Sequence, residues 1–303
     1  MKAAIAGILG LLLAAFAIPA ADAADNIVVA SKIDTEGALL GNIIAIVLKK
    51  DGLGVDNRLL LGPTQIVRRA ILEGQIDIYP EYTGNGAVFF ARESDPVWHD
   101  AARGYDTVKA LDAERNRLIW LAAAPADNSW AIAVNGDLAK THNLKSLEDF
   151  AAFVNSGGAV RLAASAEFVE SPGALPAFEK AYGFTLARRQ LLELVGGDTS
   201  ATIRAAAEGI SGVNAGMAYG TDGALAALKL VVLTDDKGAQ TVYRPAPVIR
   251  SPVLSAHPEI ASLLAPAFAG LTREKLQALN ARIAVEGDDA AVVASDYLAG
   301  LAK

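Results

Sequence analysis

The sequence predicts an α/β protein of two lobes, with a ligand cleft between them and two strands as the hinge. Short apolar runs alternate with amphipathic helical patterns along the whole chain, which is typical of sheets flanked by helices. The chain has 303 residues, which is more than one hydrophobic core usually organises. The elements of one lobe are inserted between two halves of the other lobe. Such an insertion requires two connecting strands, which form a hinge beside a cleft.

The N-terminus has the pattern of a secretory signal. A charged start is followed by the apolar run 3–21 and by the small-residue site Ala21-Asp22-Ala23, so cleavage is predicted before Ala24. A transmembrane anchor is the alternative, but Pro19 interrupts the run and no basic cluster follows it. We therefore expect residues 1–23 to be a signal peptide.

The composition limits the compartment and the partners. The chain has no cysteine, which excludes disulfides, thiolate metal sites, cysteine nucleophiles and a lipid-bearing cysteine at the mature N-terminus. The net charge of −7 disfavours nucleic acid and anionic lipid as partners. We expect a soluble monomer in a periplasm of the Gram-negative type, secreted through its cleaved signal peptide.

The first part of lobe 1 is predicted at 24–128. Thr35 is expected to cap a helix that stops at Gly52, and Gly62-Pro63-Thr64 to open a second helix that Gly74 ends. The strands of this part are predicted at 27–30, 58–61, 76–79 and 120–124, with a polar helical segment at 87–118. The alternation predicts a parallel sheet, and ligands bind off the carboxyl ends of such strands.

Lobe 2 is predicted at 129–220, and the chain then returns to lobe 1 at 221–303. Ser146-Leu147-Glu148-Asp149 has the pattern of a capping box and opens a helix that ends at Asn155. The other elements of lobe 2 are predicted to be strands at 130–135, 159–164 and 215–219 and helices at 172–182 and 199–208. The returning segment is predicted to hold a strand at 230–233 and helices at 258–268, 272–284 and 288–298.

The stretch 76–86, Ile-Asp-Ile-Tyr-Pro-Glu-Tyr-Thr-Gly-Asn-Gly, joins an apolar strand to a polar loop. Pro80 is expected to end the sheet pairing, because proline has no N–H to donate. The loop offers the Tyr82 ring, the Asn85 amide and backbone N–H groups, which suit a small ligand with a cationic end and a polar end. The alternative is an ordinary strand-to-loop turn with two tyrosines in the core.

The sequence holds no catalytic or metal-binding constellation. Glycine motifs for a nucleophile elbow, a dinucleotide or a phosphate loop are missing. His99, His142 and His257 are far apart and lie in polar contexts typical of solvated side chains. The acidic pairs Asp235-Asp236 and Asp288-Asp289 lack further carboxylates at ligand spacing. We expect no enzymatic activity, no cofactor and no metal.

Several aromatic residues fall at strand ends that face the predicted cleft: Tyr79, Tyr82, Trp130 and Tyr219. A quaternary ammonium cannot donate hydrogen bonds, so a protein holds it with ring faces, each contributing of order 1 kcal/mol or more in a dry site. The ligand's other end needs fixed donors, which Lys32, Asn85 and Asn128 could supply. Taken singly, each ring is more often part of a core than of a cage.

Four blocks are spread over nearly all of the mature chain: Ser31-Lys32-Ile33-Asp34-Thr35-Glu36-Gly37, Tyr79-Pro80-Glu81-Tyr82-Thr83-Gly84, Asn128-Ser129-Trp130-Ala131 and Tyr219-Gly220-Thr221-Asp222-Gly223. Together they resemble the substrate-binding proteins of osmoprotectant ABC importers, which bind glycine betaine and choline. The second and fourth blocks are the most specific, and the third is the weakest.

The resemblance implies a type II periplasmic binding protein fold, whose two lobes close on a trimethylammonium group held by aromatic rings. Tyr82 matches a cage tyrosine of the family, and Trp130 stands where the family has tyrosine. Lys32 matches a lysine near the ligand's carboxylate, and Asn85 replaces a threonine. The ligand-binding residues that we predict are Lys32, Tyr82, Asn85, Asn128, Trp130, Tyr219, Thr221 and Asp222.

Two departures from the family pattern concern the ligand. Family members commonly carry an arginine three residues after the phenylalanine of a Glu-Phe pair, where it helps bind the carboxylate; here Glu167-Phe168 leads to Ser171 at that position. A further cage tyrosine, expected near 199–204, is also absent. The chain thus resembles the low-affinity, stress-associated branch, with weak glycine betaine binding or a ligand that is bulkier or lacks a carboxylate.

We expect a solute-binding protein that delivers a quaternary-ammonium osmolyte, such as glycine betaine or choline, to an ABC permease in the inner membrane. Two alternatives stay open. A binding protein for an amino acid or another polar solute needs a cation and an acid side by side, which Lys32 with Glu36 or Asp222 could imitate. A transferase of the same architecture, resembling porphobilinogen deaminase, is disfavoured because that enzyme tethers its cofactor through a thiol.

Overall fold

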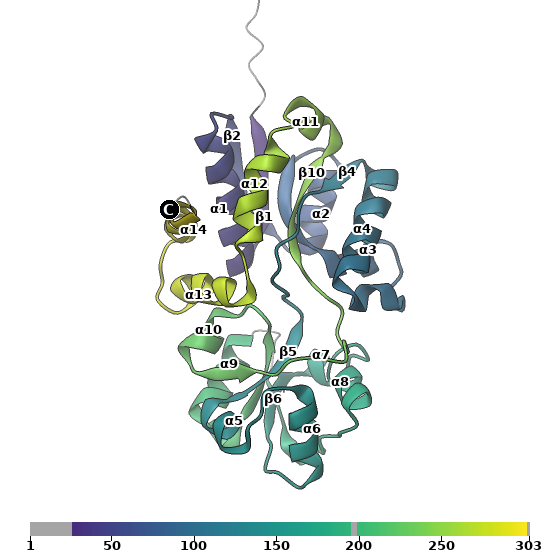
Figure 1. Cartoon of the computed structure of the whole chain (residues 1–303), viewed down its shortest axis with the longest axis vertical. Helices are drawn as coiled ribbons and strands as arrows, with labels where there is room; N and C mark the ends of the chain where they lie inside the picture. The colour runs from purple at the N-terminus through teal and green to yellow at the C-terminus, as the bar shows by residue number, and fades with distance from the viewer. Residues whose placement is uncertain (1–25, 195–198, 302–303) are drawn as a thin grey trace, which may run out of the picture.

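The computed structural model describes residues 26–194 and 199–301, and the predicted signal peptide lies outside them. Within these ranges the chain forms two five-stranded mixed sheets with helices packed around each, stacked one above the other (Figure 1). None of the helices in this part of the chain is long and apolar enough to cross a membrane. The two-lobed α/β fold predicted from the sequence is confirmed. We call the first sheet with its helices lobe 1 and the second lobe 2.

The sheet of lobe 1 has the order β2-β1-β3-β10-β4, in which the first three strands are parallel and β10 is antiparallel to both of its neighbours. The strands are β1 (Ile27–Lys32), β2 (Val55–Gly62), β3 (Ile78–Tyr82), β4 (Leu118–Trp120) and β10 (Pro245–Arg250). The helices are α1 (Thr35–Lys50), α2 (Thr64–Leu72), α3 (Gly86–Phe89), α4 (Ala101–Asn116), α11 (Ser251–Ala256), α12 (Ile260–Ala269), α13 (Arg273–Ala284) and α14 (Ala290–Leu301). Apolar clusters cover both faces, with α1, α12, α13 and α14 on one and α2 and α4 on the other.

The sheet of lobe 2 repeats this plan in the order β7-β6-β8-β5-β9, with β5 antiparallel to β8 and to β9. The strands are β5 (Trp130–Asn135), β6 (Leu162–Ser165), β7 (Leu191–Leu194), β8 (Ala215–Tyr219) and β9 (Leu230–Val232). The helices are α5 (Gly136–His142), α6 (Leu147–Asn155), α7 (Ala166–Glu170), α8 (Leu175–Tyr182), α9 (Thr199–Glu208) and α10 (Gly223–Ala227). Short 3₁₀ turns in the two lobes are η1 (Thr83–Asn85), η2 (Pro96–His99), η3 (Arg188–Gln190) and η4 (Ile210–Gly212).

Local capping explains where two of the helices begin. The Asp34 carboxylate accepts a hydrogen bond from Gly37 N (2.7 Å), so Asp34 and not the predicted Thr35 is the N-cap of α1. Ser146 and Asp149 form the predicted capping box at the start of α6. The Asp34 cap fixes the short connection between β1 and α1. This connection joins Lys32 to Glu36, two residues of the candidate ligand-binding site.

The prediction that Pro80 ends the sheet pairing is wrong. The strand β3 continues to Tyr82, and Pro80 lies opposite Pro247 of β10. Antiparallel pairs alternate between residues that exchange N–H···O bonds and residues that do not. Two facing prolines fit the second kind of position, because neither has an N–H to donate. The longer strand carries Tyr82 to the edge of lobe 1 that faces lobe 2.

The prediction that the strand at 230–233 belongs to lobe 1 is wrong. It is β9, and it pairs with β5 in lobe 2, with Val231 opposite Val134. The side of β5 that does not face β8 accepts it, so β9 completes that sheet. The chain returns to lobe 1 only after β9. The other predicted boundaries, 24–128 for the first part of lobe 1 and residue 129 for the start of lobe 2, stay predictions.

Two segments, 121–129 and 233–244, join the lobes side by side (Figure 1). They are bonded to each other: Asn128 N donates to Tyr243 O (3.0 Å), and Tyr243 N donates to the Asp127 carboxylate (2.8 Å). Burial raises the pKa of Asp127, and the hydrogen bonds that it accepts oppose this effect. These bonds tie the two connecting segments to each other, and we call the pair of segments the hinge.

We predict that Asp112→Ala destabilises lobe 1 strongly. The Asp112 carboxylate is fully buried and accepts hydrogen bonds from Arg68 Nη1 (3.0 Å) and Trp120 Nε1 (2.7 Å). Removing it leaves a buried guanidinium without its counter-charge, so we expect the free energy of unfolding to fall by about 3–5 kcal/mol. Urea unfolding followed by circular dichroism measures this loss. Arg92→Ala, in an exposed pair with Asp95, is the control and should cost about 1 kcal/mol or less.

Candidate ligand-binding site

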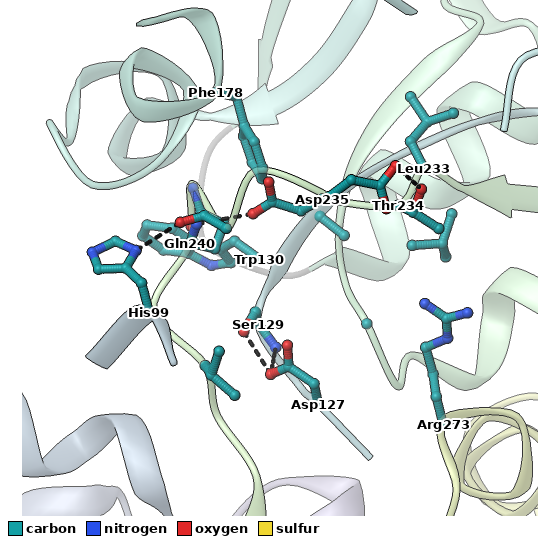
Figure 2. Close-up of a pocket in the computed structure, with 16 residues that line it drawn as sticks. His99, Asp127, Ser129, Trp130, Phe178, Leu233, Thr234, Asp235, Gln240 and Arg273 are labelled. Carbon is teal, nitrogen blue, oxygen red and sulfur yellow. Dashed lines mark hydrogen bonds between the residues drawn. The ribbon is translucent and has the colours of Figure 1, made fainter. Parts of the chain in front are cut away.

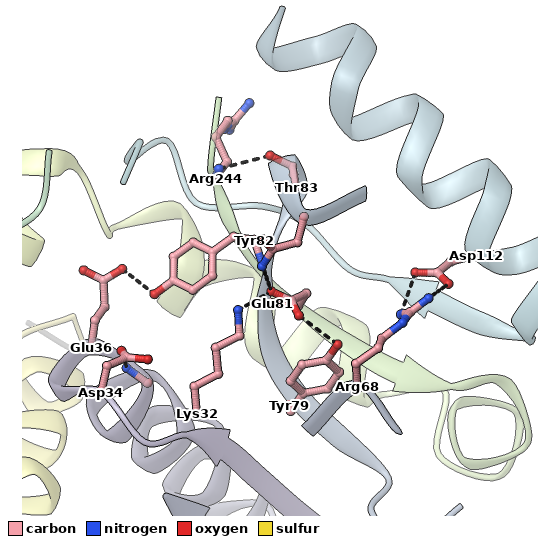
Figure 3. Close-up of polar contacts among 12 residues, drawn as sticks. Lys32, Asp34, Glu36, Arg68, Tyr79, Glu81, Tyr82, Thr83, Asp112 and Arg244 are labelled. Atoms are coloured by element: carbon pink, nitrogen blue, oxygen red, sulfur yellow. Dashed lines mark hydrogen bonds and ion pairs between the residues drawn. The ribbon is translucent and has the colours of Figure 1, made fainter. Parts of the chain in front are cut away.

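Glu81, near the end of β3, lies at the centre of a group of polar side chains (Figure 3). Its carboxylate has no exposed surface and accepts hydrogen bonds from Lys32 Nζ (2.5 Å), Asn85 Nδ2 (2.7 Å), Tyr82 N (2.7 Å) and Tyr79 Oη (3.0 Å). A buried carboxylate needs such partners to stay ionised. Lys32 and Asn85, which we predicted to hold the ligand's carboxylate, are therefore bound to the protein's own carboxylate.

Tyr82 lies between this group and α1. Its ring packs beneath Lys32, whose Nζ is 4.7 Å from the ring centroid, and its hydroxyl donates to Glu36 Oε1 (2.7 Å). Burial raises the pKa of Tyr82 well above its usual range, and the nearby carboxylates Glu36, Asp34 and Glu81 add to this. The Tyr82 phenol therefore stays neutral, and three carboxylates lie around its ring.

Glu36 is buried at the start of α1, although the sequence analysis gave it a role only in an alternative. Its Oε2 accepts a hydrogen bond from Asn280 Nδ2 (2.8 Å), and the same amide group donates to Thr221 O (2.9 Å). Burial raises the pKa of Glu36 to about 7, and the hydrogen bonds from the Tyr82 and Asn280 side chains oppose part of that rise. Glu36 thus contacts two residues of lobe 1, and Asn280 connects it to the turn after β8 in lobe 2.

Trp130 and Tyr219 face the same side of lobe 2. They lie opposite each other in the β5–β8 pairing, so their side chains share one face of the sheet. Their rings stack with centroids 6.4 Å apart, and Phe168 meets Trp130 edge-on at 5.7 Å. Burial raises the pKa of Tyr219, and nearby carboxylates add to the rise. Trp130 directly follows the connecting segment 121–129, so the pair lies at the end of the lobe 2 sheet nearest to lobe 1.

Tyr243 is an aromatic residue of this region that the sequence analysis missed. It lies on the segment 233–244, and its ring covers Gly84, where an added Cβ would come within 2.8 Å of it. Burial raises the pKa of Tyr243, and Tyr219 and Glu81 contribute to the rise. Its position would follow from the sequence only if β10 had been recognised, because that strand brings Tyr243 beside Tyr82.

The other three predicted residues bond to each other or to the backbone. The Thr221 hydroxyl donates to Asn128 Oδ1 (2.7 Å), which links the turn after β8 to the hinge. The Asp222 carboxylate accepts a hydrogen bond from Tyr219 N (2.7 Å). These contacts support the turn behind Tyr219, and a direct role of the three in ligand binding stays a prediction.

A cavity of about 300 Å³ lies against the hinge (Figure 2). Its lining includes Asp127, Trp130, Gly220, Asp235 and Arg273. Of the predicted ligand-binding residues only Trp130 lines it, so it lies beside the aromatic group. Among residues 26–194 and 199–301, no group of three or more His, Asp or Glu side chains could hold a metal ion.

Comparison with known proteins agrees with this geometry. The family model described as "Substrate binding domain of ABC-type glycine betaine transport system" matches residues 25–300. The chain is 57% identical over 287 residues to the glycine betaine-binding protein YehZ of Escherichia coli, covering 95% of this chain and 94% of YehZ. It is 32% identical over 281 residues to a glycine-betaine-binding protein of Pseudomonas aeruginosa, covering 91% and 88%.

Solved structures support the same assignment. A structure of apo YehZ superposes with a TM-score of 0.86 at 57% identity, covering 91% of this chain and 99% of that one. A structure described as a glycine betaine/carnitine/choline ABC transporter has a TM-score of 0.80 at 20% identity, covering 91% and 98%, and shares the fold. The chain therefore belongs to the family of substrate-binding domains of ABC-type glycine betaine transport systems.

Proposed function

We propose that this protein binds a quaternary-ammonium osmolyte, such as glycine betaine or choline, between its lobes and delivers it from the periplasm to an ABC permease. The observation that carries the proposal is the set of rings gathered from lobe 1, the hinge and lobe 2: Tyr82, Tyr243, Tyr219 and Trp130. Each ring face can attract a trimethylammonium group, with about 0.5–2 kcal/mol per contact depending on how dry the site is.

The charges around the rings favour a cation. Asp34, Glu36 and Glu81 surround Tyr82, whereas Lys32 is the cation paired there and is matched by Glu81. A region with more buried acid than base attracts positive charge, and the low dielectric strengthens the attraction. The cationic end of the ligand would therefore supply most of the binding free energy.

The ligand's carboxylate has weaker partners than its cation. Lys32 and Asn85 already donate to Glu81, and Ser171 stands at the position where the family commonly has an arginine. A carboxylate is bound most strongly by a bidentate guanidinium, so its absence at this position lowers the expected preference for betaine over choline. This agrees with the resemblance to the low-affinity branch.

The delivery step would use the hinge. Closure brings Trp130 and Tyr219 of lobe 2 towards Tyr82 of lobe 1, and a ligand that touches all three binds the closed state better. The closed protein would act as a monomer and present a joined surface to the permease. The membership in a transport family supports this role over catalysis.

Binding of an amino acid is the second candidate and is less well supported. It would need Lys32 beside Glu36 or Asp222, but Lys32 pairs with Glu81, and Asp222 accepts a bond from Tyr219 N. The cation and acid required to grip an α-amino acid are therefore not paired as that alternative needs.

We predict that Tyr82→Ala, Trp130→Ala and Tyr243→Ala each weaken the binding of glycine betaine and choline at least about tenfold, because each removes one ring face and leaves water in its place. Titration calorimetry of the mature protein at pH 7.5, with ligand up to 10 mM, gives the dissociation constants. The control is Phe153→Ala, a ring on α6 at the end of lobe 2 away from lobe 1, which should leave affinity unchanged (Figure 1). Retained affinity in all three site variants would refute the cage.

We predict that Ser171→Arg raises affinity for glycine betaine about tenfold and leaves affinity for choline unchanged or lower. Ser171 ends α7, one helical turn after Phe168, whose ring contacts Trp130, so the substitution places a guanidinium on the helix that adjoins the proposed cage. Competition between the two ligands measures the change in preference. The control is Ser171→Gln, which adds a longer polar side chain without a charge. An equal gain for both ligands, or none, would contradict the prediction.

A further inference from the structure

We propose that Glu36 is a positioning residue that joins Tyr82 of lobe 1 to the turn behind Tyr219 of lobe 2, and that ligand binding releases a proton from it. The inference rests on the proposed function, since it assigns this carboxylate a role in the same site. None of the sequence motifs that point to the ligand assigns Glu36 to the cage.

The contacts form one continuous chain between the lobes. Glu36 is 5% exposed, and its two oxygens have different partners: Oε1 accepts from the Tyr82 hydroxyl (2.7 Å) and Oε2 from the Asn280 amide (2.8 Å). The same amide donates to Thr221 O (2.9 Å), two residues after Tyr219. One carboxylate thus holds the Tyr82 hydroxyl of lobe 1 directly and is connected through Asn280 to the turn that follows Tyr219 in lobe 2.

The helix that carries Asn280 is packed tightly against lobe 2. A Cβ added at Gly223 of α10 would lie 2.2 Å from Ala281 N on α13, so the backbones of the two helices are in direct contact (Figure 1). Gln277 of α13 also donates to Gly220 O (2.8 Å). Asn280 therefore presents its amide to Glu36 from a fixed position rather than from a loose side chain.

Protonation would break this arrangement. An ionised carboxylate accepts both hydrogen bonds, whereas a protonated one turns one oxygen into a donor, which then faces either the Tyr82 hydroxyl or the Asn280 amide. Both of those groups are donors in the present geometry, so one bond is lost or both reorient. The charged form of Glu36 is the form that positions the two halves of the cage.

The charged groups that face Glu36 determine the pH at which its carboxylate is protonated. Asp34 lies before α1, Glu81 and Tyr82 belong to β3, and Lys32 belongs to β1, while Asn280 offers a neutral donor. Burial and Asp34 raise the pKa of Glu36 to about 7, so the carboxyl titrates near neutrality. A ligand cation beside the Tyr82 ring favours the charged form and lowers this pKa, and by linkage a lower pH weakens binding.

Proton release tests the proposal directly. We would titrate glycine betaine into the mature protein at pH 7 in phosphate and in Tris, whose ionisation enthalpies differ, and derive the protons exchanged. Wild type should release up to about half a proton per ligand, because a group near its pKa is about half ionised. Glu36→Gln should release none, while Glu73→Gln, an exposed glutamate after α2, should behave as wild type.

The pH profile gives a second measure. Wild-type affinity should rise about 3- to 10-fold from pH 6 to pH 8, since one unit of pKa shift between free and bound protein corresponds to tenfold in affinity. Glu36→Gln should give a flat profile. Equal proton release in wild type and Glu36→Gln, or proton uptake by wild type, would overturn the proposal while leaving quaternary-ammonium binding intact.

Further variants cover the case in which Glu36→Gln does not fold. Asn280→Ala and Tyr82→Phe each remove one donor to the carboxylate, so both should move the midpoint of the affinity profile to higher pH; an unmoved midpoint in both would overturn the proposal.

The remaining case is a wild type that binds no quaternary ammonium, which refutes the proposed function. Glu36 is then tested by melting without ligand. Its raised pKa stabilises the fold fully below about pH 4.5 and ceases to do so as pH rises through 7, so wild type should lose stability relative to Glu36→Gln between pH 5 and 8. Parallel melting curves would overturn its titration.

Discussion

Glu81 has no exposed surface, and its carboxylate accepts hydrogen bonds from four groups that come from β1, β3 and the loop after β3. A charge removed from water is tolerated only when it is paired in this way. The requirement fixes Lys32 above the Tyr82 ring and holds Asn85 at the start of the loop. It also sets the orientation of Tyr82, because the backbone N–H of Tyr82 is one of the four donors. The lobe 1 half of the site depends on this single pairing.

The same pairing decides what the site can recognise. Lys32 and Asn85 donate to Glu81, so in the proposed function the ligand would be recognised by the rings of Tyr82, Tyr243, Tyr219 and Trp130 and by the negative charge of the surrounding acids. Aromatic rings bind a bulky methylated cation without hydrogen bonds. A carboxylate, in contrast, is bound by hydrogen-bond donors in fixed positions. The proposed site would therefore be specific for the cationic end of a ligand and tolerant at the other end.

Much of this could be predicted from the sequence, and the failures concern contacts between distant segments and one short edge strand. The strands β1, β2, β3, β6 and β8 are apolar runs between helices and were predicted, whereas β7 at the edge of lobe 2 was not. Tyr82, Trp130 and Tyr219 lie at the ends of predicted strands. The strand β10 was not predicted, because Pro245 and Pro247 are atypical of a central strand. The prolines fit there because Pro247 lies opposite Pro80, which is far away in the sequence. Without β10 the position of Tyr243 and the late return of the chain to lobe 1 could not be inferred. Glu36 escaped for a similar reason, since its partner Asn280 is 244 residues away.

A binding protein has to hold its ligand and also give it up, and the link between the lobes bears on both. A buried salt bridge across the gap would be costly to break, at about 3–5 kcal/mol when one partner is left alone. Glu36 contributes to the link through hydrogen bonds from Tyr82 and Asn280, about 1.5–3 kcal/mol each when the acceptor is charged and less when it is neutral. Asn280 extends this link to Thr221 O in lobe 2, beside the packing of α10 against α13. Because the pKa of Glu36 is about 7, the neutral form is always accessible near physiological pH. We infer that a titratable carboxylate at this point keeps the connection between the two halves of the cage strong enough to align the rings and weak enough to be undone.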